Sequence, residues 1–449
     1  MRALHLVLTL LAALAAACAP EPNPRSVLIV VSDSLAAAHV GSYGAARDTT
    51  PHFDRFAQRG VRFERAYAQS SWTLPSVASV FTSLPQESHS LRSLEQRLDE
   101  RWPTLAESFR ARGYRTAAIV QTPVLGSRAG LGRGFDAYSV LDGSNSSCDA
   151  ALERARREWS ADGDAPLFLY VHLTPPHMPY QPPAPFRGRF STPSESAVDG
   201  SIASARRIHK DGLAPDHEDV QRLCALYDEN IAYADARVGA FLDDVQRTPR
   251  GARALALWTA DHGEAFMQHG AQGHNANVFE EMVRVPMAWV ALDGSFSGRV
   301  EGAVACLLDI APTLVELCDL RPLPDARGVS LAPLLRSSDA RLAPRDLVLS
   351  SRYYDAHPQR LHLALVRESL KLHWDVERDA WSAFDLAQDP SESRDVFVGR
   401  ERELAEMRGT LRAVRAATTR APTPSAPSSA GDTELEHREA LRKLGYTED

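Results

Sequence analysis

Two uninterrupted apolar runs most constrain the fold of this chain. Residues 26–33, SVLIVVSD, and residues 167–173, LFLYVHL, lack the polar alternation of a half-exposed strand. Strands buried on both faces are typical of parallel sheets covered by helices. The segments TPHFDRFAQRGVRFERAY, TLAESFRARGYRTAAIV and ARVGAFLDDVQRTPRGARALALWTAD each predict a helix, a glycine-containing turn and an apolar strand. This alternation predicts a layered α/β domain.

The pattern changes in the C-terminal third of the 449 residues. Beyond about residue 345 the short pieces LVLSSRYY, LHLALVRE and SLKLHWD predict an antiparallel meander. We therefore expect a main domain over 25–340 and a small subdomain over 345–400. Residues 401–449 are predicted to contain a helix, a Pro/Ser-rich linker and a terminal helix. The polar stretch 190–220 is expected to be an irregular, exposed excursion.

The N-terminus, MRALHLVLTLLAALAAACAP, has the features of an export signal. Arg2 precedes an apolar run that is too short to span a bilayer comfortably, and three alanines stand before Cys18. We expect residues 1–18 to be a signal peptide with a lipoprotein cleavage box, so that a lipid on Cys18 tethers an exported protein to a membrane. The alternative is an ordinary signal peptide that is cleaved near the same alanines.

The remaining composition excludes some functions. The net charge of −8, with no basic block, argues against nucleic-acid binding. The four other cysteines lack C-x-x-C spacing, which argues against a structural zinc site, and buried free thiols are the simplest expectation: they are Cys148, Cys224, Cys306 and Cys318.

Polar side chains stand at the ends of the predicted strands, where α/β sheets bind ligands. Asp33 ends the first strand, Asp261 and His262 end LALWTA, and His177 follows LFLYVHL. Thr73 stands at the start of a helix predicted over 74–84, with Pro75 in its first turn. Carboxylates, an imidazole and a hydroxyl make an oxygen-rich site for one divalent cation. The structural alternatives are that Thr73 is only a helix cap and that an aspartate at a strand end only forms a turn.

Eight segments, in order along the chain, resemble the sulfatase family of the alkaline phosphatase superfamily. They are LIVVSDSLAAAHVGSYG, TTPHFDRFAQRGVRFERAYAQSSWTLPSVASVFTSL, HLTPPHMPYQPP, YDENIAYADARVGAFLDDV, TADHGEAFMQHGAQGHNANVFEEMVRVP, LLDIAPTLVEL, RGVSLAPLL and AFDLAQDPSESRDVF. The resemblance covers roughly residues 25 to 400. It implies a large mixed sheet sandwiched by helices, a small C-terminal antiparallel sheet, and one divalent metal cation, for which Ca²⁺, Mn²⁺ and Zn²⁺ all suit the ligands.

The resemblance also implies roles for individual residues. Asp33, Asp261 and His262 fall on metal-ligand positions, and Thr73, which would also face the metal, falls on the nucleophile position. His177 and His274 fall on positions that contact the ester group or its leaving oxygen. His269 matches a further histidine that is frequent near the active site, and we give it less weight.

Four positions depart from the family pattern. Thr73 replaces the Cys or Ser that sulfatases oxidise to formylglycine, Val77 replaces the arginine that supports it, and Ser34 replaces a second aspartate. Gln121 lies near the place of a frequent active-site lysine. With threonine at the nucleophile position, this chain is similar to those relatives of the family that transfer phosphoryl groups.

The resemblance therefore implies an enzyme that cleaves sulfuric or phosphoric esters of small molecules, glycans or lipids. The alternatives are a degenerate sulfatase fold that only binds ligands, and a true sulfatase working without formylglycine.

Overall fold

The computed structural model describes residues 25–143, 147–192, 196–352, 361–420 and 441–442. Its centre is an eight-stranded sheet in the order β10-β2-β9-β6-β1-β5-β3-β4. The strands are β1 (Val27–Ser32), β2 (Val61–Tyr67), β3 (Arg115–Val120), β4 (Ala137–Val140), β5 (Leu167–Leu173), β6 (Leu255–Thr259), β9 (Met287–Ala291) and β10 (Arg299–Cys306). Only β9 runs antiparallel to its neighbours, β2 and β6, so the sheet is mixed as expected.

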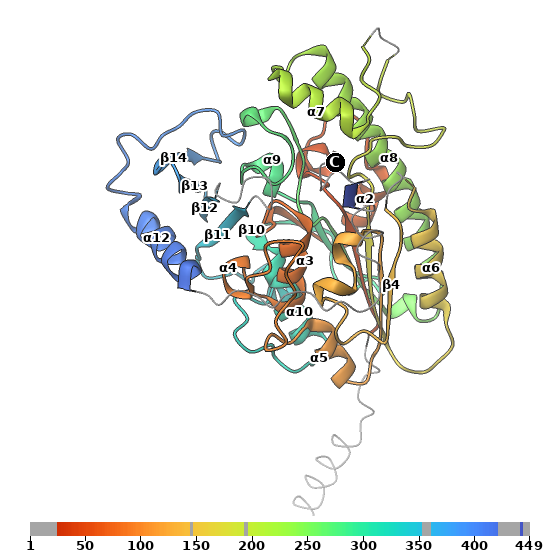
Figure 1. Cartoon of the computed structure of the whole chain (residues 1–449). Coiled ribbons are helices and arrows are strands. Elements are labelled where there is room, and N and C mark those ends of the chain that lie inside the picture. Colours follow the sequence, from red (N-terminus) through yellow and green to blue (C-terminus); the bar gives the residue numbers. More distant parts are fainter. Residues whose placement is uncertain (1–24, 144–146, 193–195, 353–360, 421–440, 443–449) are drawn as a thin grey trace, which may run out of the picture.

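Helices cover both faces of this sheet (Figure 1). One group packs around the long helix α8 (Glu218–Arg247) and includes α2 (Pro51–Ala57) and α6 (Asp149–Ser160). The other group contains α3 (Thr73–Thr82), α5 (Leu105–Ala111), α10 (Ile310–Leu317) and α11 (Ala332–Arg336). The strands of the centre, β1, β5 and β6, are buried along their whole length, which explains their unbroken apolar sequences.

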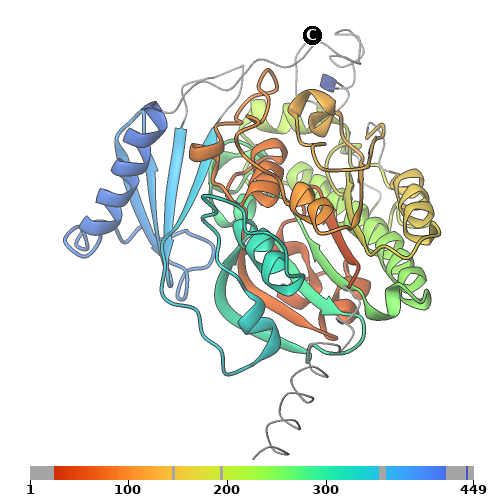
Figure 2. The same cartoon turned by 90° about the horizontal axis from the view of Figure 1, so that it is seen from below.

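A separate four-stranded antiparallel sheet follows in the C-terminal part of the chain, as predicted. It consists of β11 (Leu347–Arg352), β12 (Leu361–Arg367), β13 (Leu370–Asp375) and β14 (Ala380–Asp385) in sequential order. Figure 2 shows α12 (Ala405–Arg420) on the face of this sheet that looks away from the large sheet. Two smaller elements matter for the site: the hairpin of β7 (Ala265–Phe266) and β8 (Gln272–Gly273), and the short helix α9 (Glu280–Val283).

Two expectations about local structure need correction. The stretch 190–220, expected to be irregular, contains a helix, α7 (Ile202–Asp211). Ser201 caps α7 by accepting a hydrogen bond from Ser204 N, and Gly212 ends it at φ 60°, but its apolar face is too small to give a helical pattern. The helix predicted over 74–84 begins one residue earlier and ends at Thr82, where Ser83 adopts φ 56°.

The described residues bear on some of the remaining expectations. Within them, no helix is long and apolar enough to cross a membrane. Three of the four cysteines there are buried free thiols, and Cys224 is a half-buried one. The predicted signal peptide with Cys18, most of the Pro/Ser-rich linker and nearly all of the terminal helix lie outside the described residues.

Candidate active site

Three neighbouring strands, β6, β1 and β5, bring two carboxylates and an imidazole to one point at the carboxyl edge of the large sheet. Asp33 follows β1, Asp261 follows β6, and His172 is the last residue but one of β5. His172 Nε2 lies 3.4 Å from Asp33 Oδ2 and 3.8 Å from Asp261 Oδ2. One ligand atom from each of these three side chains lies within 4.8 Å of the others. All three are buried, so their charges act on one another with little screening by water.

His262 directs one ring nitrogen at the same point. Its Nδ1 lies 2.9 Å from the carbonyl oxygen of Gly263, which can only accept, so Nδ1 carries the proton. In the neutral ring Nε2 then has a free lone pair. That atom lies 3.5 Å from Asp33 Oδ1 and 3.5 Å from Asp261 Oδ2. His262 therefore presents the acceptor nitrogen that a metal ligand requires.

Thr73 meets this cluster from the opposite direction. The N-cap of α3 is Trp72, and Thr73 is the first helical residue rather than the cap residue itself. Its hydroxyl lies 3.2 Å from His262 Nε2, to which it can donate. Thr73 is fully buried beside the cluster. The structure thus brings together all four residues that the sequence analysis assigned to the metal: Asp33, Thr73, Asp261 and His262.

The donor set fits a cation. Asp261 Oδ1 accepts hydrogen bonds from the backbone N–H groups of Ser34 (3.2 Å) and His262 (3.0 Å), whereas the buried Oδ2 accepts none in the described part of the chain. Burial alone would raise the pKa of Asp33, but the imidazoles of His177, His172 and His262 hold it well below its usual range. Two ionised carboxylates buried at one point are costly unless positive charge balances them, which a divalent cation would do.

His172 was missed by sequence reasoning. Its ring Nδ1 lies 3.2 Å from the Tyr170 hydroxyl, which leaves Nε2 directed at Asp33. Burial by itself lowers the pKa of His172, but Asp33 and Asp261 raise it above its ordinary value. The sequence offered one sign of its role, because His172 is a polar residue near the end of an otherwise apolar strand. The length of that apolar run instead suggested a residue of the hydrophobic core.

Two further histidines border the cluster. The ring of His274 lies 4.5 Å from the ring of His262 and 4.9 Å from that of His177, measured between centroids. His177 Nδ1 donates to the carbonyl oxygen of Met178 at 2.7 Å, which leaves its Nε2 as the nitrogen for other partners. His269 does not join them. It stacks on Phe279 at 3.7 Å and contacts Glu281 and Glu392, next to the C-terminal sheet.

The departures from the family pattern have structural explanations. Ser34, at φ 62°, donates its hydroxyl to Asp33 Oδ1 at 3.0 Å and its N–H to Asp261, so it orients both acids. Gln121 Nε2 donates to the carbonyl oxygen of Ser147, and Gln121 Oε1 accepts from Thr174 N at 3.4 Å. The side chain therefore connects two backbone segments. Val77 belongs to α3, and its side chain is buried in the hydrophobic core.

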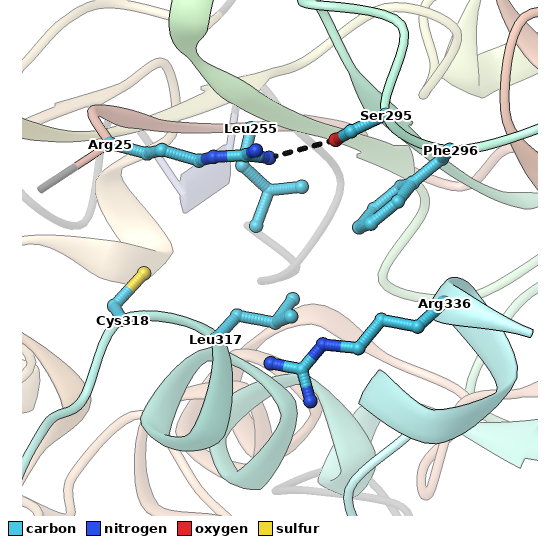
Figure 3. A pocket seen from close by; sticks show the side chains of 7 residues that line it. All are labelled: Arg25, Leu255, Ser295, Phe296, Leu317, Cys318 and Arg336. Atoms are coloured by element: carbon cyan, nitrogen blue, oxygen red, sulfur yellow. Dashed lines mark hydrogen bonds between the residues drawn. The ribbon is translucent and has the colours of Figure 1, made fainter. Parts of the chain in front are cut away.

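A cavity of about 430 Å³ lies elsewhere, at the amino edge of the same sheet. Figure 3 shows that Leu255, Phe296 and Leu317 form apolar walls while Arg25 donates to Ser295 Oγ at 3.1 Å. Leu255 begins β6, whereas Asp261 follows the end of that strand. The cavity and the cluster of acids and imidazoles are therefore on opposite edges of the sheet.

Comparison with known proteins agrees with this architecture. A family model described as Sulfatase matches residues 25–320, and a model described as N-sulphoglucosamine sulphohydrolase, C-terminal, matches residues 274–417. The chain belongs to the sulfatase family and is a sulfatase-like ester hydrolase. That family generally uses a divalent metal.

The relatives differ in what they act on. The Delta 4,5-hexuronate-2-O-sulfatase of Bacteroides thetaiotaomicron is 23% identical over 85% of this chain and 88% of its own length. The choline-sulfatase of Rhizobium meliloti is 30% identical over 54% of this chain and 48% of its own. The phosphonate monoester hydrolase of Agrobacterium radiobacter has the same fold, with a TM-score of 0.70 and 20% identity over 88% of this chain and 96% of its own.

Proposed function

We propose that this protein is an exported, metal-dependent hydrolase or transferase of phosphoric, phosphonic or sulfuric esters, with Thr73 as its nucleophile. The observation that carries the proposal is the position of the Thr73 hydroxyl, 3.2 Å from His262 Nε2 and beside the paired carboxylates of Asp33 and Asp261. A helix cap has no need of two buried acids and an imidazole around its hydroxyl.

Asp33, Asp261, His262 and His172 would hold the cation. Ca²⁺, Mn²⁺ and Zn²⁺ remain the candidates, because two carboxylates and imidazole nitrogens accept each of them. A bound divalent cation would lower the pKa of the Thr73 hydroxyl and neutralise negative charge on the ester. Ser34 supports the same arrangement from outside, since its N–H and hydroxyl fix the two acids.

The chain's own residues can then perform a two-step displacement. Thr73 Oγ1 gives its proton to water and attacks the phosphorus or sulfur atom, the bond to the leaving oxygen breaks, and that oxygen takes a proton from Nε2 of His177 or His274 in its imidazolium form. Water, or an acceptor alcohol in a transferase, attacks the threonyl ester and restores the Thr73 hydroxyl. The start of α3 assists, because its N-terminus favours an anionic group beside Thr73.

The charge of the site favours esters that carry one negative charge. The charged groups that act most strongly on Asp33 are imidazoles, and the positions of the family arginine and of the frequent lysine hold Val77 and Gln121. A phosphate monoester carries two negative charges and gains most from fixed cations, whereas phosphate diesters, phosphonate monoesters and sulfate esters carry one. Without a route to formylglycine, phosphate diesters and phosphonate monoesters are the first substrates to test.

The decisive experiment compares Thr73→Ala and Thr73→Ser in residues 19–449 with added Ca²⁺, Mn²⁺ or Zn²⁺. We expect Thr73→Ala to lose kcat by about three orders of magnitude or more, while Thr73→Ser, which keeps the oxygen, retains measurable turnover. Thr82→Ala is the matched control, because Thr82 is a buried threonine on the same helix whose hydroxyl bonds to Ala78 O. If Thr73→Ala is as active as Thr82→Ala, Thr73 is structural and the proposed mechanism is wrong.

The alternative of a ligand-binding protein on the same fold makes a different prediction. Such a protein would bind esters without turnover on phosphate diesters, phosphonate monoesters or sulfates, with or without metal. Measuring metal content together with product release on paired phosphate and sulfate esters separates the two functions.

A further inference from the structure

The carboxylate of Glu264 lies directly behind His274 and takes no part in the chemistry described above. Glu264 is fully buried, and its Oε1 lies 3.2 Å from His274 Nδ1. The side chain of His274 is 7% exposed. An ionised carboxylate can only accept hydrogen bonds, so this contact places the Nδ1 proton of His274 on the side of Glu264. Nε2 is then the nitrogen left for the ester side of the ring.

The β7–β8 hairpin fixes the two residues opposite one another. Ala265 pairs with Gly273, so Glu264 and His274 stand at the open end of a two-stranded ladder. Gly273 has φ +83°, and a Cβ there would lie 3.4 Å from Glu264 Oε1. That distance is an ordinary contact, so glycine at this position serves the left-handed backbone conformation.

Both ends of the hairpin are tied to the catalytic elements. Glu264 N donates to Glu281 O of α9 at 2.9 Å, and Asn275 N donates to Ser71 O at 3.0 Å, two residues before Thr73. Burial and then the negative charge of Glu264 hold the pKa of the Tyr180 hydroxyl well above its usual range. The position of Glu264 is thus set independently of His274.

We propose that Glu264 is the positioning residue for His274: its carboxylate accepts the Nδ1 proton and holds the ring in the orientation that presents Nε2, with the proton that Nε2 carries in the imidazolium form, to the leaving oxygen. The leaving-oxygen role of His274 rests on the function proposed above, whereas the effect of Glu264 on the ring does not. A carboxylate behind a functional histidine selects the tautomer and limits ring rotation.

The direct test is ¹⁵N NMR of histidine-labelled full-length protein, with the His274 signal assigned by its loss in His274→Gln. At a pH at which the ring is neutral, we expect wild type and Glu264→Gln to carry the single His274 proton on Nδ1, because the glutamine amide oxygen can still accept it. In Glu264→Met the signal should shift to the other tautomer or to a mixture of both. Glu281→Met is the matched control, since Glu281 contacts His269 of the same hairpin. An unchanged His274 signal in Glu264→Met overturns the proposal.

Kinetics supply a second, independent test on the best substrate found. Glu264→Met should lower kcat by about 10- to 100-fold with little change in KM, and Glu264→Gln should recover most of that loss. In a His274→Gln background, Glu264→Met should have almost no further effect, because the two residues act as a unit. An equal loss in both backgrounds would mean a general structural role and would also overturn the proposal. Failure of the nucleophile assignment would appear separately, as full activity of Thr73→Ala.

Discussion

At the scale of single residues, Asp261 shows most clearly what the site is built to hold. One oxygen of its carboxylate is satisfied by two backbone N–H groups, while the other is buried without a hydrogen bond among the described residues. An unsatisfied carboxylate oxygen in a buried site costs roughly 1–3 kcal/mol or more. A cation beside it would remove that cost, so this oxygen is the atom that a bound metal would be expected to contact.

We therefore predict that Asp261→Ala abolishes metal binding without unfolding the chain. In wild type, metal at about 100 times its Kd should add ~2.7 kcal/mol to the free energy of unfolding, and the variant should gain none. Elemental analysis of the folded variant and thermal unfolding with and without metal measure this. Stoichiometric metal in Asp261→Ala would contradict the assignment.

At the scale of elements, a buried charge network joins the C-terminal sheet to the main domain. Lys371 of β13 is fully buried, with Nζ 2.9 Å from Glu280 Oε1 of α9 and 3.1 Å from Glu392 Oε1. Burial alone would lower the pKa of Lys371, but the two glutamates raise it. Helix α9 also bonds through Glu281 O to Glu264 N, so this network braces the element that supports the site hairpin.

Lys371→Met should be strongly destabilising, because it leaves two carboxylates buried without their cation. The expected cost is about 3–5 kcal/mol of unfolding free energy. Arg378→Met is a control from the turn after the same strand: its pair with Asp375 is exposed, and its loss should cost less than about 1 kcal/mol. Urea unfolding of both variants gives the comparison, and equal midpoints would show that the buried network does not stabilise the chain.

The same network predicts acid sensitivity. Burial, and then neighbouring positive charge, hold the pKa values of His362 and His373 well below 6.5. Below pH ~6.5 the unfolded chain binds protons that these native imidazoles do not, so stability is lost as pH falls from about 7 to 5. His362→Gln should reduce this loss, since the amide can still donate to His373 Nδ1 as His362 Nε2 does at 3.1 Å. Unfolding midpoints of wild type and variant at pH 7.5 and 5.0 measure this loss of stability. An identical loss in the variant would show that His362 does not contribute to it.

At the scale of the whole molecule, the sequence predicts the architecture well but predicts few of the contacts between side chains. Unbroken apolar runs identified β1 and β5, and strand ends located Asp33, Asp261 and His177, because a parallel sheet brings those ends to one edge. His274 came only from the family resemblance, since no periodicity marks a loop histidine. His172 and Glu264 could not be predicted, because their roles depend on pairing across strands and across a hairpin that local pattern does not record.

The proposed export and anchoring concern the whole molecule as well. We predict that palmitate labels the wild-type protein and not Cys18→Ser, because Cys18 follows a short apolar run and three alanines. Cys224→Ser is the control, as Cys224 is a half-buried thiol of the folded domain. Equal labelling of Cys18→Ser and wild type would exclude lipid on Cys18.

The separation of the two sheet edges has a consequence for where substrates come from. Arg25 stands at the amino edge and Asp33 beyond the carboxyl edge, with the six residues of β1 between them, a span of about 20 Å. Residues 18 and 25 are seven positions apart, so a lipid on Cys18 would keep the amino edge within about 25 Å of the bilayer. The catalytic edge would then lie on the side of the domain away from the tether, an arrangement that favours esters arriving from the aqueous compartment over lipids of the membrane that holds the protein.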